Sequence, residues 1–289
     1  MRAALVVHAG AGRGAGARIA GTVATRLRDS VDRLDLVVAP GVAEFREAMS
    51  ARAGELDALI VLGGDGTAHE AVQFCAGTST ALGLVPVGSG NDLARGLGLS
   101  LDPLCALDTV VSALRTGLRR RADLGRADGR WFATVLCAGF DAGVSERART
   151  MTWPGGTHRY DLATLAELRS WRAKSLCVRT ETETFELEAT MIAAGNTPFY
   201  GGGIPICPGA LAADGLFDVT LVGRVGRAEL LRMLPHLRGG AHVGRPGVRT
   251  FRAREIALSG DFLAAADGEP LGSLPVVARC VPGALTLLG

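Results

Sequence analysis

Residues 59–67 read Leu59-Ile60-Val61-Leu62-Gly63-Gly64-Asp65-Gly66-Thr67, an apolar run that leads into a glycine-rich turn. The apolar run predicts a buried strand, and the glycines let backbone N–H groups approach a polyanion because no Cβ stands in the way. A helix predicted to begin at Thr67 would aim the positive end of its dipole at the same point. Asp65 suits this place mainly if a cation such as Mg²⁺, or a proton to be moved, is also present. The stretch therefore predicts a phosphate-handling turn with a built-in acid, which favours a kinase.

A plain structural turn is the alternative interpretation of the same residues. Gly-Gly-Asp-Gly is a good turn sequence, and Thr67 with Glu70 three residues later fits a helix capping box. The remainder of the chain has to decide between the two interpretations.

Composition excludes several classes of protein. The chain has 289 residues, of which 48% are hydrophobic and 21% charged, so it is globular and long enough for two domains. A net charge of +2 is too small to indicate nucleic-acid binding. Lys174 is the only lysine and no Gly-Lys-Ser/Thr loop exists, which excludes a Walker-type NTPase. No apolar run approaches the ~20 residues needed to span a bilayer, so we expect a cytoplasmic protein that can still make transient contact with the inner membrane face.

The first part of the chain alternates strands and helices. Strands are predicted at Ala3–Val7, Leu34–Val38, Ala58–Leu62 and Leu82–Val87, each followed by a turn and a helical segment. Uninterrupted apolar strands between helices predict a parallel sheet covered on both faces. Ligands bind such sheets at the carboxyl ends of the strands, where the Gly63–Thr67 turn lies.

The second part is richer in strands and implies a separate domain built on an antiparallel sheet or sandwich. We predict an α/β nucleotide-binding domain over residues 1–125, rejoined by a last strand within 283–289, and a β-rich substrate domain over 126–282. Helices are predicted at 158–172 and 226–237. Strands are predicted at 131–138, 174–179, 185–194, 216–222, 249–258 and 274–281.

Three further turns carry polar groups suited to chemistry. Gly88-Ser89-Gly90-Asn91-Asp92 follows a predicted strand and, next to the Gly63–Thr67 turn, could help to hold a nucleotide. Asp267-Gly268-Glu269 places two carboxylates in a tight turn, either for structure or as a general base worth about 10²–10⁴ in rate. Asp214 lies in a glycine turn between apolar runs, where a carboxylate and backbone carbonyls could bind a hard cation.

Four of these motifs, in this order, resemble the diacylglycerol kinase catalytic-domain family. They are Gly-Gly-Asp-Gly-Thr at 63–67, Gly-Ser-Gly-Asn-Asp at 88–92, Pro-x-Ala-x-x-x-Asp-Gly at 208–215 and Asp-Gly-Glu at 267–269. Bacterial soluble diacylglycerol kinases, related lipid kinases and sphingosine kinases share the pattern, and the resemblance covers nearly the whole chain. Further residues that look like family landmarks are Gly139-Phe140-Asp141-Ala142, Gly195-Asn196 and Tyr200-Gly201-Gly202-Gly203.

The resemblance implies a fold, a reaction and a set of site residues. The fold is a three-layer α/β domain plus a β-sandwich, with the active site in the cleft between them. The reaction is ATP- and Mg²⁺-dependent phosphorylation of a lipid hydroxyl, above all diacylglycerol to phosphatidic acid in phospholipid metabolism. Glu269 is implied as the first choice of base, with Asp267 as the other candidate and Asp65 as an indispensable acid. Leu211, Asp214 and Leu216 match a structural Mg²⁺ site. The implied nucleotide-binding residues are Gly10, Gly12, Gly63, Gly64, Asp65, Gly66, Thr67, Ala68, His69 and Ser89.

The chain departs from the family pattern in three places, one of which is Ala39 or Pro40, where the family often has Thr after the second strand. The family usually opens with Asn-Pro and a Ser/Thr-Gly turn after the first strand, where this chain has His8-Ala9-Gly10-Ala11-Gly12. The loop keeps its glycines and loses the usual Asn. His69 stands where the family commonly has Asn, so a titratable group precedes Glu70.

Several alternatives stay open at this point. NAD kinases also carry Gly-Gly-Asp-Gly-Thr, but the chain has no good match for their mid-chain Asn-Glu pair. A dinucleotide-dependent oxidoreductase would use Gly10-x-Gly12-x-x-Ala15, yet the second strand ends in Ala39-Pro40 without the required acid. A non-catalytic lipid-binding relative is the third alternative. The acceptor could instead be a sphingoid base, an undecaprenyl-type alcohol or a specialised metabolite, and the oligomeric state, a homodimer included, is open.

Overall fold

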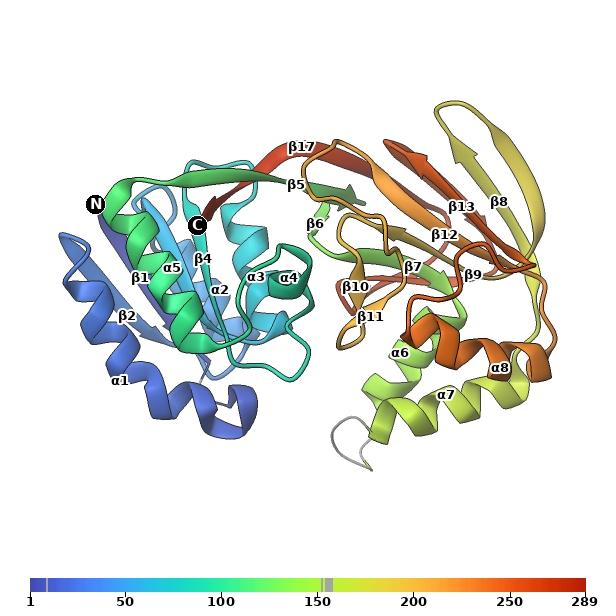
Figure 1. Ribbon diagram of the computed structural model, residues 1–289, viewed down its shortest axis with the longest axis horizontal. Helices are drawn as coiled ribbons and strands as arrows, with labels where there is room; N and C mark the ends of the chain where they lie inside the picture. The colour runs from blue at the N-terminus through green and yellow to red at the C-terminus, as the bar shows by residue number, and fades with distance from the viewer. Residues whose placement is uncertain (9, 152, 154–157) are drawn as a thin grey trace. The chain divides into compact units, whose positions relative to one another are not determined.

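The computed structural model describes residues 1–8, 10–151, 153 and 158–289 (Figure 1). It divides into two compact units, one of Met1–Leu124 with Val281–Gly289 and one of Gly125–Cys280. Two strands, β5 (Arg119–Ala127) and β17 (Val276–Leu288), contribute residues to both units. The α/β class, with an added β-rich part, agrees with the sequence-based prediction.

The first unit is built on a parallel sheet. Its strand order is β17-β4-β3-β1-β2, and the partners of β1, β3 and β4 run parallel to them. Register brings the carboxyl ends of neighbouring strands level, since Val7 lies opposite Leu62, and Gly63 opposite Pro86. All four predicted strands are confirmed to within two residues, as β1 (Arg2–Val7), β2 (Arg33–Val38), β3 (Ala58–Gly63) and β4 (Ala81–Pro86).

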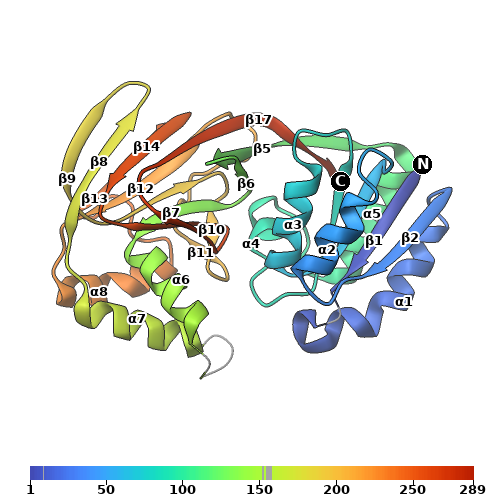
Figure 2. The same cartoon turned by 180° about the vertical axis from the view of Figure 1, so that it is seen from behind.

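Helices cover both faces of this sheet (Figures 1 and 2). Leu5 and Ile60 share a buried cluster with Leu27 of α1 and Leu107 of α5. The alternate residues of the same strands, such as Val6 and Leu59, are equally buried against the other face. This two-sided burial explains why the strands read as continuous apolar runs. The helices of the unit are the 3₁₀ turn η1 (Ala11–Gly14), α1 (Ala15–Arg28), α2 (Val42–Ser50), α3 (Asp65–Cys75), α4 (Asp92–Gly96) and α5 (Pro103–Thr116).

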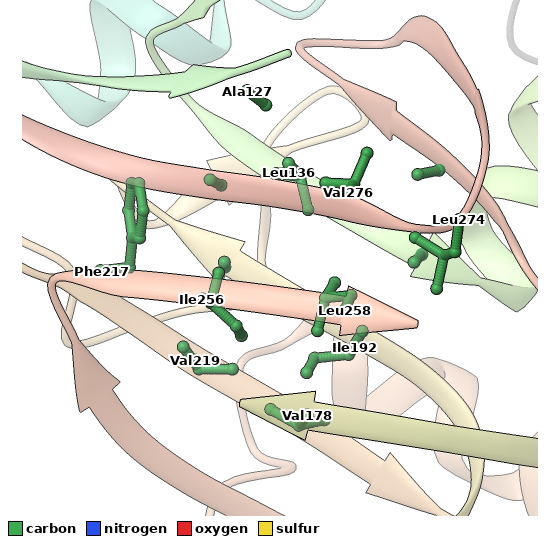
Figure 3. Packing of buried hydrophobic residues seen from close by; sticks show 14 of the residues in the cluster. Ala127, Leu136, Val178, Ile192, Phe217, Val219, Ile256, Leu258, Leu274 and Val276 are labelled. Carbon is green, nitrogen blue, oxygen red and sulfur yellow. The ribbon is translucent and has the colours of Figure 1, made fainter. Parts of the chain in front are cut away.

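The second unit is built on antiparallel strands around a large apolar cluster (Figure 3). The rings of Phe132 and Phe217 stack in this cluster with centroids 5.5 Å apart. Helices α6 (Phe140–Thr150), α7 (His158–Ser170) and α8 (Arg227–Arg238) share a second cluster with the other face of the strands. The remaining strands are β6 (Arg130–Phe132), β7 (Val135–Gly139), β8 (Lys174–Thr180), β9 (Thr184–Gly195), β10 (Phe199–Tyr200), β11 (Ile204–Pro205), β12 (Phe217–Gly223), β13 (Val248–Ala253), β14 (Glu255–Gly260), β15 (Leu263–Ala266) and β16 (Glu269–Ser273).

Several local predictions are wrong. The strand predicted over 131–138 is two strands, β6 and β7, and the strands predicted separately over 274–281 and within 283–289 are one strand, β17. The strand predicted over 249–258 is two strands, β13 and β14, because the chain leaves its pairing with β12 at Arg254 and then pairs with β8 and β17. Helix α3 begins at Asp65 rather than Thr67, and no side-chain hydrogen bond caps it. Glu70 does not close a capping box. Its two carboxylate oxygens accept hydrogen bonds from the Arg46 guanidinium at 2.7 and 2.8 Å.

None of the helices in the described part of the chain is long and apolar enough to cross a membrane.

Candidate active site

Three glycine turns come into backbone contact at the carboxyl edge of the first unit's sheet. They follow β1, β3 and β4. A Cβ on Gly12, whose φ is +60°, would lie 2.1 Å from the carbonyl oxygen of Val87. A Cβ on Gly88 would lie 2.7 Å from the Cα of Gly64. Since real Cβ atoms do not make such contacts, these turns can approach one another only as glycines.

The Asp65 carboxylate joins two of these turns. Its Oδ2 accepts a hydrogen bond from the Asn91 N–H at 2.7 Å, and its Oδ1 accepts one from the Asp92 N–H at 2.6 Å. Asn91 in turn closes the Gly88 turn, because its side chain accepts from the Gly88 N–H and donates to the Gly88 carbonyl, both at 2.9 Å. Each carboxylate oxygen has a second lone pair, so this positioning role leaves Asp65 able to bind a cation.

The start of α3 offers unused backbone donors beside Asp65. The Ala68 N–H donates to the Gly64 carbonyl at 3.0 Å, so the N–H groups before it have no intrahelical acceptor. Gly66 is exposed and Thr67 is partly exposed. These donors, with the positive end of the helix dipole, suit an anion such as a phosphate. A small hollow at this place is lined by Gly63, Gly64, Asp65 and Asn91, together with Val61, Ala68, Leu84, Val85, Pro86, Leu93 and Ala94.

The residues predicted to bind nucleotide are therefore gathered by the fold in one region. Gly63 to Ala68 form the turn and first helical residues after β3, and Gly10 and Gly12 lie in the turn after β1. Ser89 is exposed in the turn after β4. His69 lies further along α3, with its Nε2 atom 3.5 Å from Nε2 of Gln73. Nucleotide binding by these residues stays a prediction.

His8 is the residue that the resemblance places where the family usually has Asn. Its Nδ1 lies 3.1 Å from the Ala39 carbonyl oxygen, and because a carbonyl can only accept, Nδ1 carries the proton. The other ring nitrogen, Nε2, lies on the side of Gly10. The substitution thus replaces an amide with an imidazole whose second nitrogen faces the first glycine turn. Ala9 lies outside the described residues.

In the second unit, Asp267 is held by backbone donors. Asp267 and Gly268 form the two-residue loop between β15 and β16, with φ values of +52° and +82°, which is the geometry that favours Asp-Gly in a hairpin. Oδ2 of Asp267 accepts from the Ala133 N–H at 2.9 Å. Oδ1 accepts from both the N–H and the hydroxyl of Thr134, at 2.8 and 2.6 Å. Asp267 therefore has a clear structural task.

Glu269, the neighbouring candidate, is exposed. The pKa of Arg149 is raised mainly by its hydrogen bond to Glu146, and the negative charge of Glu269 adds to the shift. Glu269 is thus a carboxylate in solvent with an arginine nearby, and the hairpin does not depend on it. Of the two candidate bases, Glu269 is the one whose side chain is available to a substrate.

At the cation site implied at Asp214, an arginine already neutralises part of the negative charge of the carboxylate. Oδ1 of Asp214 accepts from the Leu216 N–H at 3.1 Å, and Oδ2 pairs with the Arg252 guanidinium. The same guanidinium donates from Nε to Asp218 at 3.2 Å. Across the described residues, no group of three or more His, Cys, Asp or Glu side chains is placed to hold a metal. A cation at Asp214 would therefore need the carbonyls of Leu211 and Leu216.

Asp141 is a buried acid that the sequence analysis named only for its resemblance to a family motif, and it is hydrogen-bonded to Tyr200, which was named for the same reason. The hydroxyl of Tyr200 donates to Oδ2 of Asp141 at 2.8 Å. Burial raises the pKa of Asp141 to about 7, although the Tyr200 hydrogen bond acts in the opposite direction. Sequence reasoning assigned neither residue a role, because a contact between positions 59 residues apart leaves no local pattern.

Two family models match the chain, and together they cover nearly all of it. The diacylglycerol kinase catalytic domain matches residues 2–127, and the YegS C-terminal NAD kinase beta sandwich-like domain matches residues 134–289. The chain belongs to the diacylglycerol kinase family. The predicted resemblance is thereby confirmed, as is the expectation of a β-sandwich-like second part.

Relatives from several bacteria carry the name diacylglycerol kinase. The Mycobacterium tuberculosis protein is 38% identical over 286 residues, which cover 96% of this chain and 91% of that protein. The Bacillus subtilis protein is 29% identical over 237 residues, covering 79% of this chain and 76% of that one. A crystal structure of a diacylglycerol kinase from Bacillus anthracis matches with a TM-score of 0.75 at 19% identity, over 99% of this chain and 96% of that one. The last comparison concerns the fold alone.

Proposed function

We propose that this protein transfers the γ-phosphoryl group of ATP to the hydroxyl of a diacylglycerol, forming phosphatidic acid. The observation that carries the proposal is the Asp65 carboxylate holding together two glycine turns at the edge of the sheet, in a chain of the diacylglycerol kinase family. Such an arrangement presents backbone donors to a polyphosphate, and phosphoryl transfer asks the protein mainly for positioning and charge neutralisation.

In this proposal the first unit binds the nucleotide. The N–H groups at the start of α3 and the turns at Gly12 and Gly88 hold phosphate oxygens. When bound, Mg²⁺ would neutralise charge on the phosphates, and Asp65, whose carboxylate joins two of those turns, would hold it directly or through water. Glu269 of the second unit accepts the proton of the attacking hydroxyl, while Asp267 fixes the hairpin that carries it.

The direct test is transfer of labelled phosphate from ATP with Mg²⁺ to a panel of acceptors dispersed in detergent. The panel contains a diacylglycerol, a sphingoid base, a polyprenyl alcohol, a water-soluble alcohol and NAD. We expect the diacylglycerol to be the preferred acceptor. Preference for another alcohol would support kinase activity with a different substrate. No transfer to any acceptor would favour a non-catalytic lipid-binding relative.

The proposed Mg²⁺ site at Asp214 gives a separate prediction. A cation and the Arg252 guanidinium compete for the same carboxylate, so Arg252→Gln is expected to tighten Mg²⁺ binding. Thermal unfolding measured against MgCl₂ concentration should show the half-saturating concentration fall in Arg252→Gln and the response disappear in Asp214→Ala. Arg249→Gln, on the same strand and paired with Glu183 instead, is the matched control. An unchanged response in Asp214→Ala would remove this site from the proposal.

We place the enzyme in the cytoplasm, in transient contact with the inner membrane face where its lipid substrate lies. A homodimer is compatible with the proposal.

A further inference from the structure

His8 lies at the place in the first sheet where the order of the strands changes direction. Strand β1 lies between β2 and β3, so the chain passes from β1 to the neighbour on one side and then to the neighbour on the other. Ligands of such sheets bind at this change of direction, beside the carboxyl ends of the two strands. His8 directly follows β1, and its N–H donates to the carbonyl of Leu62 in β3 at 3.2 Å. His8 therefore borders the site proposed for ATP.

The imidazole of His8 has one nitrogen bound by the protein and one nitrogen available to a ligand. Nδ1 donates its proton to the carbonyl of Ala39, 3.1 Å away. In the neutral ring the other nitrogen, Nε2, then holds a lone pair and can only accept a hydrogen bond. Nε2 has no hydrogen-bond partner among the residues that the structure describes, and a Cβ placed on Gly10 would lie 3.7 Å from it. His8 is partly exposed.

An acceptor at this place suits only certain groups of a nucleotide. Phosphate oxygens accept hydrogen bonds, so they match the N–H groups at the start of α3 and not a neutral Nε2. The donors of ATP are the ribose hydroxyls and the amino group of adenine. Neighbouring strands lie about 4.8 Å apart, so phosphates held after β3 bring the adjoining sugar, rather than the far edge of the base, to the end of β1.

We infer that Nε2 of His8 accepts a hydrogen bond from a ribose hydroxyl of bound ATP, and that His8 thereby selects ATP over the analogue that lacks this hydroxyl. The inference rests on the proposed function, because it takes ATP as the phosphate donor. Asn, the usual residue of the family here, could supply the amide nitrogen that replaces Nδ1, since both atoms are bonded to Cγ. No atom of Asn reaches the place of Nε2. The selection is therefore a property of the residue that this chain has in place of Asn.

Equilibrium dialysis of labelled nucleotides, without an acceptor lipid, measures this selection separately from phosphoryl transfer. The probes are ATP, 2′-deoxy-ATP, 3′-deoxy-ATP and inosine triphosphate, each with MgCl₂ at about pH 8, where an ordinary imidazole is uncharged. We expect one of the two deoxy analogues to bind about tenfold more weakly than ATP, as the loss of one hydrogen bond predicts. Inosine triphosphate, which keeps both hydroxyls and lacks the amino group, should bind as ATP does.

Three variants connect the selection to Nε2. His8→Asn keeps a donor for the Ala39 carbonyl, so it should melt as the parent does and bind ATP and both deoxy analogues equally. His8→Gln brings an amide oxygen close to the place of Nε2 and should recover part of the preference. His236→Asn on α8 is the matched control, because Nδ1 of His236 also lies beside a carbonyl, that of Arg232 at 2.9 Å. It should keep the full preference.

The outcomes separate this contact from catalysis. Equal binding of ATP and both deoxy analogues by the parent would overturn the inference, and so would a preference that His8→Asn retains. Weaker binding of inosine triphosphate in place of a deoxy analogue would also overturn it, because the adenine amino group would then be the donor. If the preference is present and is lost in His8→Asn, yet no acceptor is phosphorylated, the nucleotide contact stands and the proposed phosphoryl transfer fails.

Discussion

Replacing Glu269 with glutamine is expected to lower kcat by about 10²–10⁴, the usual contribution of a general base. The amide keeps the size and polarity of the carboxylate and loses its ability to accept the hydroxyl proton. Because Glu269 is exposed and the hairpin does not depend on it, the midpoint of thermal unfolding should stay the same. The measurement is kcat and KM for ATP and for diacylglycerol, beside a thermal melt, and both KM values should change little.

Two variants sharpen this test. Glu229→Gln alters another exposed glutamate of the second unit, on α8, and should leave both kcat and the melt unchanged. Asp267→Asn should lower the melting midpoint, because an amide NH₂ group replaces one of two oxygens that accept hydrogen bonds from Ala133 and Thr134. If Glu269→Gln retains full kcat while Asp267→Asn loses activity without losing stability, the roles of the two acids are reversed.

Strands β1, β3 and β4 of the first unit could be predicted from the sequence because burial on both faces of a parallel sheet leaves an unbroken apolar run. The glycine turns could be predicted as well, since backbone contacts as close as that of Gly12 with Val87 tolerate no side chain. In the second unit, the pattern of apolar residues predicted the strand boundaries less well. The change of partner at Arg254, between β13 and β14, depends on which strands lie alongside, and no local periodicity records that.

The roles of individual acidic residues could not be predicted from the sequence either. The motif Asp267-Gly268-Glu269 presents two carboxylates, and only the fold shows that one of them binds the backbone of residues 133 and 134. Likewise, Thr67 and Glu70 had the spacing of a capping box, yet Glu70 found a stronger partner in Arg46 of α2. Local spacing predicts what a residue can do, and long-range packing decides among the possibilities.

Asp65→Asn is expected to abolish phosphoryl transfer and also to reduce stability. Both Asp65 oxygens accept backbone hydrogen bonds, from Asn91 and Asp92, and the amide can accept only one of them. Loss of a hydrogen bond to a charged group costs about 1–3 kcal/mol in the free energy of unfolding. The same change removes the negative charge proposed to hold Mg²⁺ and loosens the contact between the turns proposed to bind phosphate. Labelled-phosphate transfer and urea unfolding measure the two effects on one preparation.

Asp102→Ala is the control that separates positioning from chemistry. Asp102 caps α5, where its Oδ1 accepts from the N–H groups of Leu104 and Cys105, both at 2.9 Å. It therefore performs a similar backbone task in the same unit, on a helix that carries none of the glycine turns. Alanine removes both hydrogen bonds, so Asp102→Ala should also lower stability, by about 0.5–2 kcal/mol, and leave kcat unchanged. If Asp65→Asn is destabilised and still transfers phosphate at an undiminished rate, then Asp65 serves the fold alone, and the acid that handles the nucleotide's cation has to be sought elsewhere in the chain.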